Sequence, residues 1–127
     1  MKKVQIQIEY IFNSVSRKSL WEQIATSPGL THWFAEKVEI KKQTYTFYWN
    51  KEAASAEAVV YKEERRIHFR WLEEEDDDAF FEFRIHTIEL TGATVLEITD
   101  YCDPEEKSET IDLWDTQVDA LKRSLGV

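Results

Sequence analysis

The sequence predicts an α+β fold in which a curved antiparallel sheet of about six or seven strands wraps around a long C-terminal helix. Two observations predict it. From residue 38 to residue 101 apolar and polar residues alternate with a period of two, which is typical of half-buried strands. From residue 111 onward apolar residues recur every three or four positions, as in an amphipathic helix packed on a broad apolar surface. At 127 residues the chain is long enough for one core, so we expect a single domain over residues 1–127.

The N-terminal segment predicts a strand followed by two short helices. Its alternating apolar residues are Val4, Ile6, Ile8 and Tyr10. Helical spacing of Leu20, Trp21 and Ile24 predicts a helix over residues 17–25. Ser27 and Pro28 are typical of the cap and first position of a second, very short helix.

The middle of the chain predicts a meander of strands joined by short turns. The predicted turns lie at residues 41–43, 50–52, 65–66, 73–78 and 91–93. Short connections favour antiparallel pairing of consecutive strands. Beyond Thr87 the apolar positions shift by one residue, to Ile88 and Leu90, which predicts a β-bulge.

Both ends of the last helix are specified by the sequence. Its apolar stripe consists of Ile111, Trp114, Val118, Leu121 and Leu125. The segment from Asp103 to Glu106 resembles a capping box at the start. Lys122 and Arg123 suit the last turn, and Gly126 is a natural stop.

Composition excludes several classes of protein. The net charge is −9, and the acidic run from Glu73 to Asp78 supplies most of it. This charge opposes binding to nucleic acid and to anionic lipid surfaces. We therefore expect no nucleic-acid partner, and no apolar stretch is long enough to predict insertion into a membrane. Cys102 is the single cysteine, which permits no internal disulfide, and we expect a cytoplasmic protein.

Few residues point to chemistry. His68 and His86 lie on predicted strands, on the face opposite the large aromatic residues, where a solvated surface is a simpler interpretation than a metal site with Glu82 or Glu57. The carboxylates beside Cys102 disfavour a reactive thiolate. No phosphate-loop, dinucleotide or nucleophile motif is present. We therefore predict no catalytic residue, no bound metal ion and no cofactor.

Several short segments resemble the START-like (helix-grip, SRPBCC) superfamily, and within it the heat-shock chaperone ATPase activator homologues. These segments are Glu9-Tyr10, Leu20-Trp21-Glu22-Gln23-Ile24, the run from Pro28 to Ala35, Ile67-His68-Phe69-Arg70-Trp71, and the run from Leu113 to Lys122. The resemblance implies a helix-grip fold, which commonly leaves a cavity between sheet and helix. The family often has glycines before its third and fourth strands, whereas glycine occurs here only at positions 29, 92 and 126. Fewer glycines predict less sharply bent strands and a smaller cavity.

The inner surface of the sheet is the remaining candidate for a site. We predict a non-catalytic binding module that holds a small hydrophobic or amphipathic ligand between the sheet and the C-terminal helix. The predicted lining residues are Trp33, Tyr45, Phe47, Trp49, Phe69, Trp71, Phe83, Ile85, Thr87, Ile98, Asp100, Trp114 and Val118. Among them Thr87 and Asp100 are the expected polar anchors. So many bulky rings can also fill this space by themselves, and the sequence leaves a filled core and a pocket open as alternatives.

Two other functions remain as alternatives. The first is a protein-interaction domain with a filled core, acting as a chaperone cofactor or a homodimer. It is favoured by the acidic run at residues 73–78 and by exposed apolar groups such as Leu72 and Tyr48. The acidic run is more simply interpreted as a solvated hairpin tip that keeps a sheet edge soluble. The second is a cyclase-like or hydrolase-like enzyme, which requires convergent polar groups in a cavity, and the sequence offers few of them.

Overall fold

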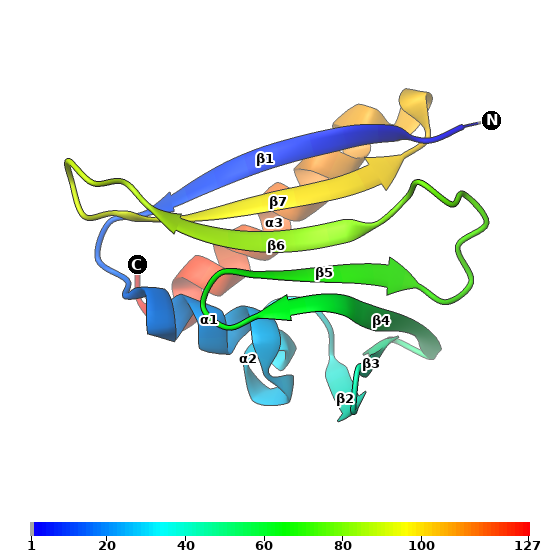
Figure 1. Cartoon of the computed structure of the whole chain (residues 1–127), viewed down its shortest axis with the longest axis horizontal. Coiled ribbons are helices and arrows are strands. Elements are labelled where there is room, and N and C mark those ends of the chain that lie inside the picture. The colour runs from blue at the N-terminus through cyan, green and yellow to red at the C-terminus, as the bar shows by residue number, and fades with distance from the viewer. Residues whose placement is uncertain (1) are drawn as a thin grey trace.

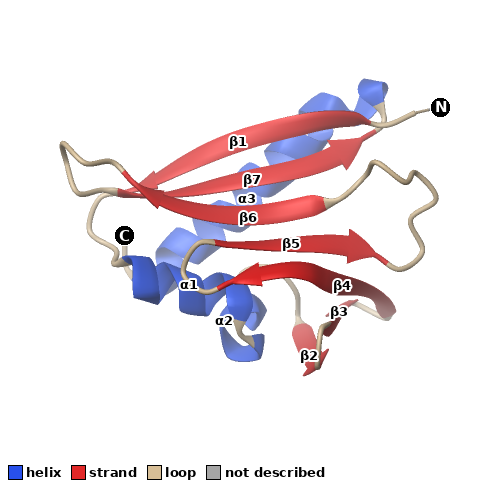
Figure 2. Cartoon of the chain, viewed as in Figure 1, coloured by secondary structure: helices blue, strands red, loops and turns tan. Residues whose placement is uncertain are grey.

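The structure, a computed structural model, describes residues 2–127 as one antiparallel sheet with helices packed against it (Figures 1 and 2). The strands are β1 (Val4–Phe12), β2 (Lys37–Lys41), β3 (Thr44–Trp49), β4 (Glu52–Lys62), β5 (Arg66–Trp71), β6 (Phe81–Thr87) and β7 (Thr94–Cys102). The helices are α1 (Arg17–Ala25), α2 (Ser27–Thr31) and α3 (Lys107–Leu125), with a 3₁₀ turn at Pro104–Glu106. Among these helices none has both the length and the apolar character that crossing a bilayer requires.

The strand order is β1-β7-β6-β5-β4-β3-β2, and every neighbouring pair is antiparallel. Strands β2 to β7 form a meander, and β1 adds to its far edge beside β7. α3 crosses one face of the sheet, behind the strands in Figure 1, while α1 and α2 lie at one end. This arrangement confirms the predicted α+β helix-grip fold.

Strand β4 explains how so many rings fit on one face. Its inward positions carry the small residues Ala54, Ala56 and Ala58. Ala54 lies opposite Phe47 of β3, and Ala56 lies between Tyr45 of β3 and Trp71 of β5. Because alanine occupies little volume, the large side chains of the two neighbouring strands extend over β4.

The residue that caps α2 differs from the prediction. Thr26, rather than Ser27, caps α2, since its hydroxyl accepts a hydrogen bond from the Gly29 N–H at 3.1 Å. The Ser27 hydroxyl instead donates to the carbonyl of Val38. Gly29 is required by packing, because a Cβ at this position would lie 1.9 Å from the carbonyl oxygen of Glu22 in α1.

The β-bulge predicted after Thr87 is wrong. Strand β6 ends at Thr87, and the chain then leaves the sheet in a turn closed by a hydrogen bond from the Gly92 N–H to the Ile88 carbonyl at 2.8 Å. Leu90 is 98% exposed. The shift in apolar positions therefore marks the end of a strand, and the bulge of this sheet lies in β4, between Ala58 and Val60.

The start of the last helix also differs from the prediction. The side chain of Asp103 makes no capping hydrogen bond, and α3 begins at Lys107 after the 3₁₀ turn. A hydrogen bond with Asp103 instead raises the pKa of the Glu106 carboxyl. The other end agrees with the prediction, since Gly126 adopts a left-handed conformation with φ of 76° and donates to the Arg123 carbonyl.

Candidate functional site

The space beneath the middle of α3 is filled with side chains. Nine of the predicted lining residues are buried in the core: Trp33, Tyr45, Phe47, Phe69, Phe83, Ile85, Ile98, Trp114 and Val118. The ring of Phe34, which follows α2, lies at the centre of this group. Its centroid is 4.9 Å from that of Phe47, 5.9 Å from that of Phe83 and 5.7 Å from that of Trp114. Of the two alternatives, a filled core therefore describes this region.

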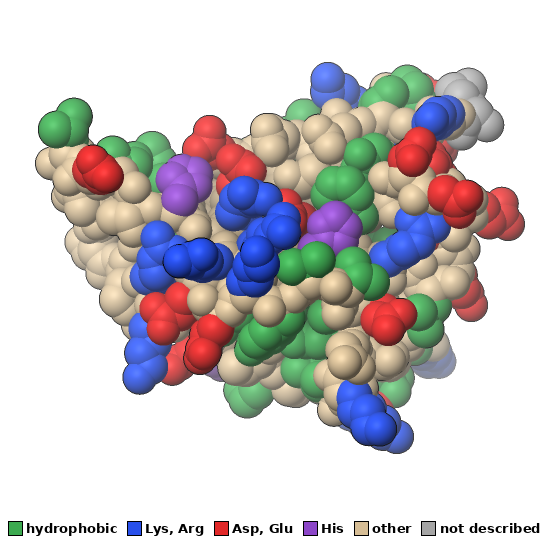
Figure 3. Space-filling view, viewed as in Figure 1, with side chains coloured by type: hydrophobic (Ala, Val, Ile, Leu, Met, Phe, Trp, Pro, Cys, Tyr) green, Lys and Arg blue, Asp and Glu red, His purple; other side chains and the backbone are tan. Residues whose placement is uncertain are grey.

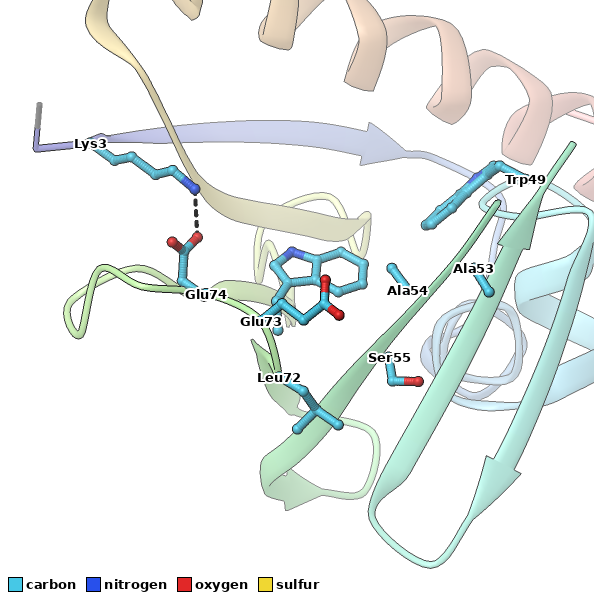
Figure 4. Close-up of a pocket in the computed structure, with 9 residues that line it drawn as sticks. Lys3, Trp49, Ala53, Ala54, Ser55, Leu72, Glu73 and Glu74 are labelled. Carbon is cyan, nitrogen blue, oxygen red and sulfur yellow. Dashed lines mark hydrogen bonds and ion pairs between the residues drawn. The ribbon is translucent and has the colours of Figure 1, made fainter. Parts of the chain in front are cut away.

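A groove remains at one end of the sheet, beside the N-terminal half of α3. It consists of two adjoining hollows, of about 340 and 540 Å³, that share Trp49 and Trp71. The first is lined by Phe34, Trp49, Trp71, Asp100, Thr110, Leu113, Trp114 and Gln117. The second, shown in Figure 4, is lined by Lys3, Trp49, Ala53, Ala54, Ser55, Trp71, Leu72, Glu73 and Glu74. We refer to both together as the aromatic groove.

Hydrogen bonds and ring contacts hold the two shared tryptophans in place. The Trp49 indole N–H donates to the Phe34 carbonyl at 2.7 Å, and Gln117 of α3 donates to the same oxygen at 3.3 Å. The Trp71 ring packs on Phe81, with centroids 4.8 Å apart. The centroids of Trp49 and Trp71 are 6.3 Å apart. The groove walls are therefore preorganised rather than loose side chains.

Asp100 supplies a carboxyl group to the groove. One of its oxygens accepts a hydrogen bond from the Trp114 indole N–H at 2.9 Å, and the other accepts from the Tyr101 N–H at 2.8 Å. Burial raises the pKa of this carboxyl, although both hydrogen bonds favour the charged form. The group can accept a hydrogen bond from a ligand or, once protonated, donate one.

An ion pair also borders the groove (Figure 4). Nζ of Lys3, just before β1, lies 2.5 Å from a carboxylate oxygen of Glu74 in the β5–β6 connection. This hydrogen bond raises the pKa of Lys3 and lowers that of Glu74. The acidic run is thus anchored to the sheet at Glu74. No local pattern in the sequence indicates this contact, because the two residues are far apart along the chain.

The structure does not bring all predicted site residues together. Thr87 is exposed at the end of β6, where its hydroxyl accepts a hydrogen bond from Arg17 at 3.1 Å, and it lies outside the groove. Conversely, the groove contains Thr110 and Gln117, which the prediction omitted. Thr110 lies four residues before Trp114 and Gln117 three residues after it, so both lie on the same side of α3. Helical spacing from Trp114 could therefore have identified them as groove residues.

His68 and His86 are not neighbours on the outer face of the sheet. Nδ1 of His68 lies 3.4 Å from Glu82, whereas Nε2 of His86 lies 3.5 Å from Glu9. The ligand atoms of Glu9, His86 and Glu97 lie within 4.8 Å of one another. These side chains are partly exposed, a situation in which carboxylates commonly occur without a metal ion, and we assign no site to them.

Comparisons with known proteins identify the family. Residues 1–127 match the START-like superfamily domain. The structure of BfR322 from Bacteroides fragilis is 40% identical, with a TM-score of 0.69, over 98% of this chain and 93% of that chain. That of CalU16 from Micromonospora echinospora is 21% identical (TM-score 0.71), over 94% and 72% of the two chains. That of the Aha1 dimer from Colwellia psychrerythraea is 15% identical (TM-score 0.71), over 96% and 92%. None of the curated proteins compared with the chain matches it. The chain therefore belongs to the START-like superfamily.

Proposed function

We propose that this protein is a non-catalytic binding module that holds one small apolar or amphipathic molecule in the aromatic groove. A single observation carries the proposal. The rings of Tyr45, Phe47, Phe69, Phe81 and Phe83 on the inner face of the sheet are buried, whereas Trp49 and Trp71 are only half-buried and line both hollows. Aromatic surface left open inside a concave site is favourable for an apolar ligand, because binding removes it from water.

The groove also indicates the shape and polarity of the ligand. Its hollows, about 340 and 540 Å³, fall in the usual range for small-molecule sites. The two tryptophans form its apolar wall, and Asp100 and the Lys3–Glu74 ion pair are the charged groups on its border. A ligand with an apolar body over the two tryptophans and a hydrogen-bond donor facing Asp100 matches this distribution.

The chemistry of the groove supports binding over catalysis. Both oxygens of Asp100 already accept hydrogen bonds, and the Glu74 carboxylate is paired with Lys3. A hydrolase or cyclase needs an acid, a base and a stabilising donor that converge on one reacting atom. Both carboxylates are instead engaged in hydrogen bonds within the chain, which favours binding over catalysis.

A protein partner is the second candidate. Leu72 and Leu113 border the groove and are 58% and 59% exposed. An apolar side chain from another protein, including a second copy of this chain, would cover them. One structural neighbour is described as a dimer of Aha1. Sedimentation analysis over a range of protein concentrations tests this candidate, because a groove-mediated dimer dissociates on dilution and when Leu113 is changed to glutamate.

The experiment for the leading proposal is a titration with Nile red, an uncharged fluorescent apolar probe. We expect its emission to rise on binding and the fluorescence of the groove tryptophans to change with the same dependence on concentration. Leu113→Glu places a charge at the groove and should weaken this binding strongly. Leu90→Glu, on the β6–β7 turn, is the matched control, because Leu90 is 98% exposed and lies outside the groove. Equal binding by the two variants, or no binding by the unmodified protein, would contradict the proposal.

A further inference from the structure

The outer face of the sheet carries a concentration of basic side chains, although the protein as a whole is acidic. A cleft of about 490 Å³ is lined by Arg17, Lys62, Arg65, Arg66, Arg84, Ile85 and His86. Figure 3 shows the corresponding blue cluster over the β4–β5 turn and the neighbouring strands. We call this site the basic cleft. With a net charge of −9, a local excess of four arginines and one lysine requires an explanation.

Three of these cations stand in a row across adjacent strands. Lys62 of β4 lies directly opposite Arg66 of β5, and Arg66 lies directly opposite Arg84 of β6. Like charges at facing positions of neighbouring strands are destabilising. Repulsion among these three cations therefore lowers the stability of the protein without a ligand, and a bound anion would reduce that repulsion.

The protein supplies only part of the counter-charge. Glu82, buried beneath the row, lies 3.3 Å from Arg66 and 3.5 Å from Arg84, and it also faces His68. One carboxylate is thus shared among several cations. Within residues 2–127, Lys62 and Arg65 form no ion pair. The lining of the basic cleft thus carries four arginines and one lysine against the carboxylate of Glu82, while Glu63 and Glu64 of the same turn add negative charge beside it.

The backbone of the basic cleft is held in place before any ligand binds. Arg17 of α1 donates to the Glu64 carbonyl at 2.6 Å and to the Ile85 carbonyl at 3.2 Å. The Ile85 N–H donates to the Arg65 carbonyl at 2.7 Å. These bonds tie the β4–β5 turn to α1 and β6, so the entropic cost of ordering this loop is already met.

We propose that the basic cleft binds a small polyanion that carries at least two phosphate groups. Guanidinium groups match phosphate oxygens in a bidentate manner, and arginines outnumber lysine here. The positive region is short, because the same row continues from Arg84 to Glu97 of β7 and Glu9 of β1. A long nucleic acid would meet these carboxylates and the general negative charge, whereas a compact di- or triphosphate would not.

The test is isothermal titration calorimetry, which measures the affinity of the full chain for inorganic triphosphate at low and high salt. Lys62→Gln/Arg65→Gln removes two exposed cations that have no ion-pair partner, and we expect about a tenfold loss of affinity or more. Lys41→Gln/Lys42→Gln, at the β2–β3 turn, removes the same charge outside the basic cleft and should bind nearly as well as the unmodified chain. Arg84→Gln serves as a second cleft variant.

Thermal unfolding gives an independent measurement. Triphosphate should raise the Tm of the unmodified chain and of the Lys41/Lys42 variant more than that of the Lys62/Arg65 variant. Equal losses in the two double variants would show a general charge effect and overturn the proposal, as would the absence of binding at low salt. A dimer in sedimentation analysis that dissociates with the Lys62/Arg65 changes would also overturn it, because the acidic run of a second copy would then be the occupant.

Discussion

Both halves of α3 lie against the same sheet, but they differ in what surrounds them. Leu121, on the buried stripe of the C-terminal half, is 0% exposed, whereas Leu113, which lies beside that stripe in the N-terminal half, is 59% exposed. The C-terminal half lies near α1 and α2 (Figure 1), whose buried side chains include Leu20 and Ile24. The N-terminal half borders the aromatic groove. We refer to these as the closed half and the open half of the interface.

The difference shows that the helix does not by itself decide whether a helix-grip fold contains a site. The short helices and Phe34 fill the closed half and the centre, and the groove persists only beyond them. Small residues on the inner side of β4 then keep the open half wide next to Trp49 and Trp71. Substitutions in the two halves should therefore have different consequences.

The largest effect is expected from Phe34→Ala, at the boundary between the halves. The Phe34 ring contacts those of Phe47, Phe83 and Trp114, and its loss leaves a cavity beneath α3. Substitutions of this type cost about 3–5 kcal/mol. Urea unfolding measures the loss, and binding of Nile red should increase if the cavity joins the groove. A cost below about 1 kcal/mol would mean that the centre is not packed as described.

A paired truncation compares the buried stripe of the closed half with the groove side of the open half. Leu121→Ala should reduce the free energy of unfolding by about 2–5 kcal/mol, because it empties a closed space. Leu113→Ala should change it by no more than about 0.5 kcal/mol, since that side chain is mostly in water. Both values come from urea unfolding of the two variants. Similar losses would show that the open half is covered in solution, for example by a second copy of the chain.

A smaller, pH-dependent effect is expected at Asp100 in the open half. Burial raises the pKa of its carboxyl in the folded state, so protonation favours folding and the buried charge reduces stability at neutral pH. Asp100→Asn removes that charge, and we expect its greatest stability relative to the parent chain at neutral pH. The advantage should shrink as the pH falls through the raised pKa toward the ordinary value of about 4. Urea unfolding at several pH values measures this, and an advantage that grows in acid would contradict it.

Tyr45 offers a control for that measurement. It is buried next to α1, where its hydroxyl donates to the Ala25 carbonyl at 3.1 Å. Burial raises the pKa of this phenol to about 12, so it stays neutral throughout the acidic and neutral range. Tyr45→Phe should therefore show no change in its effect on stability over the pH range in which Asp100→Asn changes.

The sequence predicted the fold because the relevant patterns are local. Alternation in strands such as β3 and β5 identified the inward rings, and the spacing of Trp114, Val118 and Leu121 identified the buried side of α3. The prediction was wrong where the apolar pattern changed because the chain left the sheet. Past Thr87, a shift in apolar positions was interpreted as a bulge, whereas the chain simply leaves the sheet.

The candidate site was less predictable, because it depends on which rings meet. Alternation placed Phe47 and Trp49 on the same face but did not distinguish the buried ring from the half-buried one. That distinction depends on position in the fold, since Phe34 packs against both rings but Trp49 is the last residue of β3. The basic cleft was equally hidden, since Lys62, Arg66 and Arg84 become neighbours only through the register of three strands.

The pairing of β1 with β7 has a consequence for synthesis of the chain. Val4 lies opposite Cys102, and Phe12 lies opposite Thr94, so β1 has no partner until β7 has left the ribosome. Closing such a long loop is slow compared with forming the hairpins of the meander. During that interval β1 is an unpaired alternating strand of the kind that aggregates or recruits chaperones. The sheet edge formed by β1 therefore cannot be completed until the meander from β2 to β7 has been synthesised.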